Sequence, residues 1–172
     1  MNPPKKNTNE ILYKLELSDD DKDDIILIAI KSNMPDYKIA YHLNRHLNIK
    51  FCKVIPEISV EDKGTSYFRS FKYEDEKNYL VWRLFENKSC YTENINHGTL
   101  ALFEKNEEAL GTTNYLIPEW RTIDYFLLIE NTDFLFDTES LLERIQNIPN
   151  ISTQFEVAID SLNIKSQKNL IF

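Results

Sequence analysis

The stretch "YFLLIENTDFLFDTESLLERIQNIPNISTQFEVAI", residues 125–159, contains a strand, a helix and a second strand in close succession. Its first six residues form an apolar run of the length expected for a buried strand. A helix is predicted over 137–148, with Asp137 or Thr138 as its N-cap. Residues 151–159 then return to a strand-like pattern. Apolar residues recur at helical spacing along one face of the helix, at Leu141, Leu142, Ile145 and Ile148.

The same order of elements occurs earlier in the chain. Residues 25–30, "IILIAI", form a continuous apolar run, as expected of a strand that is covered on both faces. A helix is predicted over 35–47, with Ser32 or Asn33 as its N-cap. Residues 49–54 alternate in polarity and predict another strand. The apolar face of the helix consists of Ile39, Ala40, Leu43 and Leu47.

Two aromatic-rich segments lie between these units, at 66–73 and 78–85, and the short acidic stretch between them predicts a β-hairpin. Two strand–helix–strand units with antiparallel strands between them indicate an α+β fold. We therefore expect a mainly antiparallel sheet with two helices packed on one face, in a ferredoxin-like arrangement or an elaboration of it. The alternative is that the hairpin belongs to a separate small sheet.

The remaining segments set the predicted domain boundaries. Residues 1–10 are expected to be a flexible N-terminal tail, and residues 11–172 are expected to form a single domain. Alternation within 11–17 predicts a strand with one solvated side. Residues 87–111 lack a clear period and contain two of the three glycines of the chain, so we expect a long loop there.

The composition limits the compartment and the partners. The chain carries 28 acidic and 20 basic residues, a net charge of −8, which opposes binding to a phosphate backbone. The first ten residues lack the apolar centre of a secretory signal, and no apolar run approaches the length of a membrane span. Cys52 and Cys90 lie far apart and are interpreted as reduced, buried thiols. A cytoplasmic protein that binds neither nucleic acid nor membrane is predicted.

Residue patterns that would indicate catalysis are weak. His42 and His46 have the spacing that places two imidazoles on one helix face, but Leu43 stands where a metalloprotease has Glu. We interpret the pair as part of a solvated basic face. The acidic cluster at 18–24 lacks the Gly of a calcium loop, and no glycine-rich loop resembles a phosphate-binding motif. No catalytic residue, metal or cofactor is predicted, and the protein is not expected to be an enzyme.

Residues 117–124, "IPEWRTID", stand directly before the apolar run that begins at 125. Pro118 lacks a backbone N–H and fixes φ, so it ends strand pairing before the next strand starts. Glu119 and Asp124 flank a turn, where a carboxylate can accept backbone N–H groups. Trp120 is large enough to cover an edge of the core or to anchor a partner. The stretch is therefore either a structural turn or a binding site that presents Glu119, Trp120 and Asp124.

The C-terminal stretch "SLNIKSQKNLIF" ends in three apolar residues, Leu170, Ile171 and Phe172. Burying one such side chain contributes about 1.5–3 kcal/mol, so the three together could hold the tail against the body of the domain. Alternatively, they dock on a partner protein, as short apolar C-terminal peptides can. We expect intramolecular docking, because an exposed Leu-Ile-Phe end would promote aggregation.

Three stretches carry a resemblance to a known family: "DYKIAYHLNRHL" (36–47), "LIPEWRTIDYFLLIE" (116–130) and "KSQKNLIF" (165–172). In their order and spread over the chain they resemble the uncharacterised IPExxVD family of Bacteroidetes bacteria. The family motif has two residues between Glu and Val-Asp, whereas three residues separate Glu119 from Ile123 here. The resemblance implies a bacterial lineage and attaches no activity, cofactor or catalytic residue.

Two functions from different classes remain open. The first is a non-enzymatic cytoplasmic protein that binds another macromolecule, a protein partner, through an exposed surface that includes the aromatic hairpin and Trp120. The second is a small-ligand-sensing regulatory module of ferredoxin-like type, because residues 125–159 resemble the strand–helix–strand half of amino-acid-sensing domains. Those domains usually have a Gly in the ligand loop before the helix, and residues 130–139 contain none.

Overall fold

A computed structural model of the chain describes residues 24–61, 65–89, 91–93 and 113–171. The tail predicted at 1–10, the strand predicted at 11–17 and Phe172 lie outside the described residues. Most of the loop predicted at 87–111 lies outside them as well. Among the described residues, no helix is both long enough and apolar enough to cross a membrane.

The predicted α+β fold with a mainly antiparallel sheet is confirmed. Within the described ranges, six antiparallel strands form the main sheet in the spatial order β2-β5-β6-β8-β1-β9. Their bounds are β1 (Ile25–Ser32), β2 (Cys52–Lys53), β5 (Ser70–Asp75), β6 (Leu80–Glu86), β8 (Tyr125–Glu130) and β9 (Ile151–Glu156).

The centre of this sheet has the ferredoxin-like topology. In chain order the four central strands are β1, β6, β8 and β9, and in space they run β9-β1-β8-β6, with β8 between β1 and β6 and with β1 between β8 and β9. Helix α2 (Asp36–Leu47) follows β1, and helix α3 (Thr138–Gln146) joins β8 to β9. Strands β5 and β2 extend the sheet beyond β6, which makes the fold an elaboration of the ferredoxin-like one.

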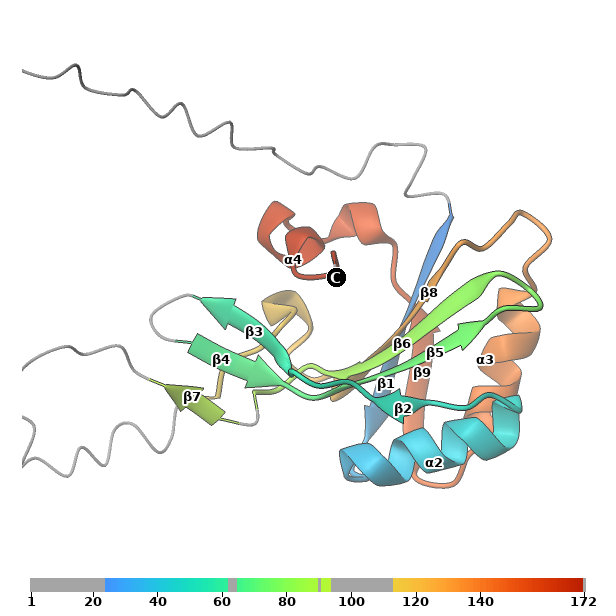
Figure 1. Cartoon of the computed structure of the whole chain (residues 1–172), viewed down its shortest axis with the longest axis horizontal. Coiled ribbons are helices and arrows are strands. Elements are labelled where there is room, and N and C mark those ends of the chain that lie inside the picture. Colours follow the sequence, from blue (N-terminus) through green and yellow to red (C-terminus); the bar gives the residue numbers. More distant parts are fainter. Residues whose placement is uncertain (1–23, 62–64, 90, 94–112, 172) are drawn as a thin grey trace, which may run out of the picture.

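Helices α2 and α3 lie side by side on one face of the sheet, as predicted (Figure 1). Each helix turns its predicted apolar stripe inward, and the side chains of alternate sheet positions complete this core. The buried members include Ile28, Ile30, Ile39, Leu43, Trp82, Leu84, Leu127, Ile129, Leu141, Ile145 and Ile148. The two-helix layer therefore rests on the sheet through the residues that define the helical period in the sequence.

The opposite face of the sheet is covered by short elements. These are the 3-10 turn η2 (Pro118–Trp120), the 3-10 turn η3 (Ile159–Ser161) and helix α4 (Ile164–Lys168). The sequence does not predict this second layer, because none of its elements is long enough to show a period. Its core contains Leu27, Ala29, Phe68, Phe85, Leu116, Ile117, Ile123, Phe126, Leu128, Val157, Ile159, Leu162 and Leu170.

The segment predicted as one hairpin strand at 66–73 is divided between two sheets. Its first part is β4 (Thr65–Phe68), which pairs with β3 (Ile58–Glu61) and with β7 (Tyr91–Glu93) in a small sheet. Its second part is β5, which forms the predicted hairpin with β6. Phe68 lies in the core under one face of the main sheet and Phe71 in the core under the other. The predicted strand is therefore interrupted at Arg69, between β4 and β5. In addition, β7 lies within the segment 87–111 that was predicted as a loop.

Two local predictions are wrong. Pro35, not Ser32 or Asn33, is the N-cap of α2, and the Ser32 hydroxyl instead donates to the backbone oxygen of Asn150 at 2.9 Å. Cys52 is exposed rather than buried, because β2 is a two-residue strand at the edge of the sheet. The strand predicted at 49–54 is reduced to these two residues, since Ile49 and Phe51 turn into the helix-covered core instead of pairing.

Candidate functional site

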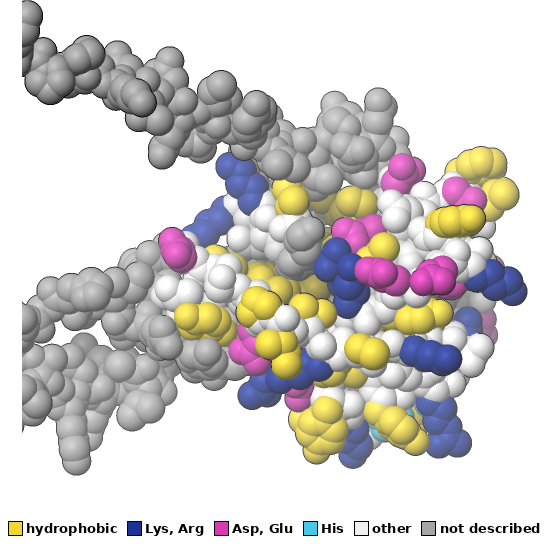
Figure 2. Space-filling model, in the orientation of Figure 1, with side chains coloured by type: hydrophobic (Ala, Val, Ile, Leu, Met, Phe, Trp, Pro, Cys, Tyr) yellow, Lys and Arg dark blue, Asp and Glu magenta, His cyan; other side chains and the backbone are white. Residues whose placement is uncertain are grey.

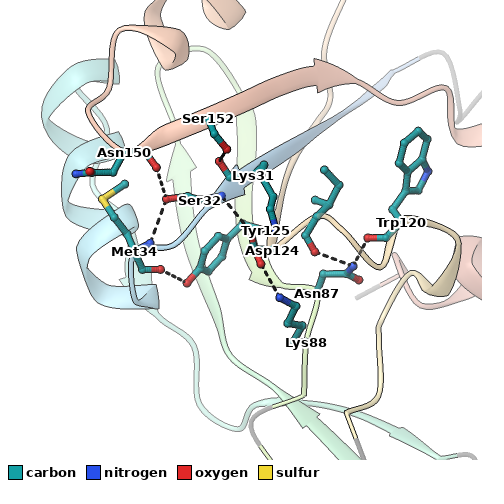
Figure 3. A network of polar contacts seen from close by, with 11 residues as sticks. Lys31, Ser32, Met34, Asn87, Lys88, Trp120, Asp124, Tyr125, Asn150 and Ser152 are labelled. Atoms are coloured by element: carbon teal, nitrogen blue, oxygen red, sulfur yellow. Dashed lines mark hydrogen bonds and ion pairs between the residues drawn. The ribbon is translucent and has the colours of Figure 1, made fainter.

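Asp124 lies directly before β8 and bonds to two lysines, Lys31 on β1 and Lys88 just after the end of β6 (Figure 3). Its Oδ1 accepts from Lys88 Nζ at 2.7 Å, and its Oδ2 contacts Lys31 Nζ at 2.9 Å and the Ser32 backbone N–H at 3.1 Å. Burial acts to raise the pKa of Asp124, but the bonds from Lys88 and Lys31 outweigh burial and hold the pKa below its ordinary value. The Asp124 carboxylate is therefore charged, and it links the start of β8 to the end of β1 and to the segment that follows β6.

Asn87 is fully buried, and its side chain bonds to the backbone of the IPEWRTID stretch, residues 117–124. Its side-chain Nδ2 donates to the backbone oxygens of Trp120 at 2.8 Å and Ile123 at 3.1 Å. Its Oδ1 accepts from the Ile117 backbone N–H at 2.8 Å. One buried amide thus pairs with three backbone groups of this segment, whose two ends, Ile117 and Ile123, are buried while the turn η2 between them is not. No sequence signal marks Asn87, since it falls in the polar stretch "ENKS".

Tyr125 follows Asp124 and ties the end of the sheet to the start of α2. Its hydroxyl donates to the Met34 backbone oxygen at 2.6 Å. Burial raises the pKa of the phenol well above its usual range, and the negative charges of Glu86 and Asp36 add to the effect. The phenol therefore stays protonated at neutral pH and acts as a hydrogen-bond donor, not as an acid–base group.

Glu119 joins the turn η2 to the C-terminal helix. The Asn163 backbone N–H donates to Oε1 at 2.8 Å, and the Ser166 hydroxyl donates to Oε2 at 2.7 Å. Burial acts to raise the pKa of Glu119, but these two bonds outweigh it and lower the pKa. The neighbouring Trp120 is partly buried, and its ring centroid lies 5.1 Å from that of Phe155 on β9.

The C-terminal residues complete this layer. Leu170 is buried in the core of the second face, and the Asn169 side chain donates to the Leu116 backbone oxygen at 2.8 Å. Ile171 is exposed. Glu119, Trp120 and Leu170 thus all lie in the layer on the second face of the sheet and make contacts within the chain. Asp124 is separate from them and bonds to Lys31 and Lys88. A partner-binding role for these residues stays a prediction.

The histidine pair on α2 is arranged along the helix. The ring centroids of His42 and His46 lie 6.1 Å apart, and His46 Nδ1 is 2.9 Å from the backbone oxygen of His42. That contact leaves only Nε2 of His46 for any other ligand. In the part of the chain that the structure describes, no three His, Cys, Asp or Glu side chains are grouped as metal ligands would be.

A large groove lies at the other end of β8, between the β5–β6 hairpin and the start of α3. Its volume is about 800 Å³, within the range of roughly 300–1,000 Å³ that is common for ligand pockets. We call it the hairpin groove. Apolar side chains from both helices and from the hairpin line it, namely Leu47, Ile49, Tyr73, Leu80, Trp82, Leu135, Phe136 and Leu141. Its polar rim includes Asn48, Asp75, Lys77, Asn78, Asn131, Asp133, Asp137, Ser140 and Arg144.

Trp82 is the unusual member of this lining. Its side chain is only 7% exposed, and its indole N–H has no hydrogen-bond acceptor among the described residues. The ring of Phe136 lies next to the Trp82 ring in a tilted arrangement, with the two ring centroids 6.2 Å apart. Buried tryptophan N–H groups usually find a partner, because an unpaired donor loses its hydration without compensation. One residue of the groove lining therefore carries a buried hydrogen-bond donor that has no acceptor among the described residues.

Exposed aromatic and aliphatic side chains flank the hairpin groove. Phe134 and Leu135, in the loop between β8 and α3, are 94% and 73% exposed, and Tyr79 in the hairpin turn is 81% exposed. Figure 2 shows hydrophobic side chains protruding at the upper right, where Figure 1 places that loop. Tyr79 also has a φ of 58°, a conformation uncommon for a non-glycine residue. The sequence signal for this surface was the apolar triplet at 134–136 in an otherwise polar loop.

Comparisons with protein-family models, with curated proteins and with solved structures gave no match to this chain. The resemblance to the IPExxVD family therefore stays a prediction. The hairpin groove and the lysine network of Asp124 are defined by the geometry of this chain alone.

Proposed function

We propose that this protein is a non-enzymatic binding protein that holds a partner protein at the hairpin groove. The observation that carries the proposal is a large groove, lined by both apolar and polar side chains, that includes the exposed Leu135 and lies next to the exposed Tyr79 and Phe134. A groove of this size with exposed apolar side chains around it is typical of an interaction site. The lining of the groove does not include Glu119, Trp120 or Asp124, and the carboxylates of Glu119 and Asp124 bond within the chain.

The proposal places the protein in the cytoplasm and in a bacterial lineage related to the IPExxVD family. An exposed free thiol at Cys52 is compatible with a reducing compartment. The net charge of −8 argues against nucleic acid as the partner. No catalytic step is assigned to the chain.

Site-specific photo-crosslinking tests the proposal. A photoreactive phenylalanine analogue placed at Leu135 should give a discrete crosslinked band in lysate of the source organism. The matched control carries the same analogue at Ile164, which is 71% exposed on the other side of the sheet and outside the groove lining. A band that forms equally from both positions, or from neither, would contradict a binding site at the hairpin groove.

A small-ligand-sensing module is the second candidate, and the volume of the hairpin groove favours it. The groove is lined by the segment between β8 and α3, where the amino-acid-sensing domains that residues 125–159 resemble carry their ligand loop. A ligand that binds only the folded state raises the melting temperature saturably. Thermal-shift screening against amino acids and nucleotides should therefore show such a rise if this candidate is right, and none if the ligand is a protein.

A further inference from the structure

The unpaired indole N–H of Trp82 restricts what can occupy the hairpin groove. A donor that is buried without an acceptor favours any ligand that supplies one, because the group has already lost its water. Phe136 packs near the Trp82 ring, with the two ring centroids 6.2 Å apart, and it belongs to the same loop as the exposed Phe134 and Leu135. Because the N–H is buried, a ligand that packs against this loop would bond to it only after a neighbouring side chain such as Phe136 shifts. The ligand must combine an apolar group with a hydrogen-bond acceptor.

The rim charges favour a neutral acceptor over a carboxylate or a phosphate. Three carboxylates, Asp75, Asp133 and Asp137, surround the groove. They face two cations, of which Arg144 already donates from its guanidinium to the His46 backbone oxygen at 2.7 Å. An anionic ligand would meet like charges there, whereas a backbone carbonyl carries no net charge. The acidic rim therefore favours a peptide segment over a free amino acid or a nucleotide, each of which carries an anionic group.

The apolar surface also extends beyond the groove on both sides. Tyr79 lies on the hairpin and Phe134 on the opposite loop, next to the lining residue Leu135. The Asn131 side chain connects the two sides by donating to the Tyr79 backbone oxygen at 3.3 Å. A short ligand would fill the groove and leave these side chains in water. An elongated segment can cover them as well, since peptide ligands use side-chain pockets and main-chain hydrogen bonds together.

We infer that a peptide segment of the partner protein occupies the hairpin groove, with one backbone carbonyl bonded to the Trp82 indole N–H and one apolar side chain packed beside Leu80 and Leu141. The inference rests on the proposed function, because it names the chemistry of the ligand for that same groove. The segment is neutral or basic, in keeping with the acidic rim.

Nuclear magnetic resonance of the ¹⁵N-labelled full chain tests the hydrogen bond directly. The chain has two tryptophans and so two indole signals, which the Trp120→Phe variant assigns. The probe is a peptide selected on the full chain from a phage-displayed random dodecamer library. On titration the Trp82 indole proton should move downfield while the Trp120 proton stays in place. A selected peptide that binds without moving the Trp82 signal overturns the inference.

Substitutions separate the inference from the proposed function. Trp82→Phe keeps an aromatic ring and removes the donor, so it should weaken the selected peptide about five- to tenfold, and Trp120→Phe should leave the affinity unchanged. Circular dichroism checks that both variants fold, and the indole shift of the unsubstituted chain decides the matter if Trp82→Phe does not. Peptides that lose affinity on Leu135→Ser but not on Trp82→Phe overturn the inference and leave the proposed function standing.

Two further outcomes would contradict the peptide assignment, and the first of them would contradict the proposed function as well. If no selected peptide loses affinity on Leu135→Ser, the hairpin groove is not a protein-binding site and both the inference and the proposed function fail. If free amino acids stabilise the chain saturably and displace the selected peptide, the ligand is a small molecule and the peptide assignment is overturned.

Discussion

The two ends of strand β8 differ in how far their polar groups are paired within the chain. At its start, Asp124 and the Asn87 amide bond to neighbouring backbone and lysine groups, so that every carboxylate and amide oxygen there has a partner. Beyond its end, the hairpin groove leaves the Trp82 indole N–H without an acceptor among the described residues and exposes Phe134 to solvent. Both ends are built on the same rigid sheet, so the difference lies in the loops.

This contrast shows where a ligand is needed. A polar network that is satisfied within the chain stabilises the fold and gains little from a partner. A buried donor without an acceptor, beside exposed apolar side chains, gains from one. The residues around the start of β8 should therefore affect stability, and the residues of the hairpin groove should affect binding.

The largest effect on stability is expected at Asn87. The change Asn87→Ala removes the partners of the Ile117 N–H and the Ile123 carbonyl in a buried turn, and each unsatisfied group costs about 1–3 kcal/mol. We expect Asn87→Ala to lower the free energy of unfolding by about 3–5 kcal/mol in urea denaturation. Asn147→Ala, at the exposed end of α3, is the control and should cost about 1 kcal/mol or less. Equal losses would show that Asn87 does not hold the turn.

The second effect concerns the helix beside the hairpin groove. Ile145 is fully buried on α3 and Glu143 is exposed on the other side of the same helix. Ile145→Ala should cost about 2–5 kcal/mol through lost burial and a cavity, whereas Glu143→Ala should cost less than about 0.5 kcal/mol. Urea denaturation of both variants measures the difference. Similar values for the two would mean that the helix is rotated from the position described.

The long elements of the fold could be predicted from the sequence because they repeat a period. The stripes Ile39–Leu47 and Leu141–Ile148 mark both helices and the face on which they lie. The second layer could not be predicted, since η2, η3 and α4 are three to five residues long and are held by distant partners. Glu119 bonding to Asn163 and Ser166 is such a contact, and no local pattern encodes a separation of more than forty residues.

The candidate site shows the same limit. Glu119, Trp120 and Asp124 were recognisable as a turn before a strand, and their bonds within the chain agree with that role. The hairpin groove was not predicted, because it arises where the β5–β6 hairpin meets a loop more than fifty residues away. Only the apolar triplet at 134–136 was visible in the sequence, and exposure is a property of the folded surface.

A third prediction tests whether the C-terminal residues belong to the stabilising layer. Leu170 is buried in the core of the second face, so Leu170→Ala should cost about 2–4 kcal/mol. In thermal denaturation about 1 kcal/mol corresponds to roughly 2–4 °C for a chain of this size. The exposed neighbour Ile171 provides the control, and Ile171→Ala should change the melting temperature by about 2 °C or less. If the melting temperature of Leu170→Ala is unchanged, the tail serves a partner instead.

The fourth prediction uses pH on the network of Asp124. Its pKa is lower in the folded chain than the ordinary value of 3.8, so its contribution to stability is present above about pH 4 and is lost as pH falls through the lowered pKa. Asp124→Asn should cost about 1–3 kcal/mol at pH 7. The gap between the two proteins in melting temperature should close as pH falls below 4. A gap that stays constant between pH 7 and pH 3 would show that the charge of Asp124 does not matter.

The smallest effect on stability is expected at the hairpin groove, and it is the sharpest test of the division between the two ends. Phe134 is 94% exposed, so Phe134→Ser removes little buried area and should change the free energy of unfolding by less than about 0.5 kcal/mol. The same change should weaken partner binding, because exposed aromatic side chains beside a groove act as anchors. Asn87→Ala should show the reverse where the variant is still folded, with lower stability and unchanged affinity. If Phe134→Ser destabilises the chain as much as Asn87→Ala, the loop between β8 and α3 is part of the folded core, and the hairpin groove is not a binding surface.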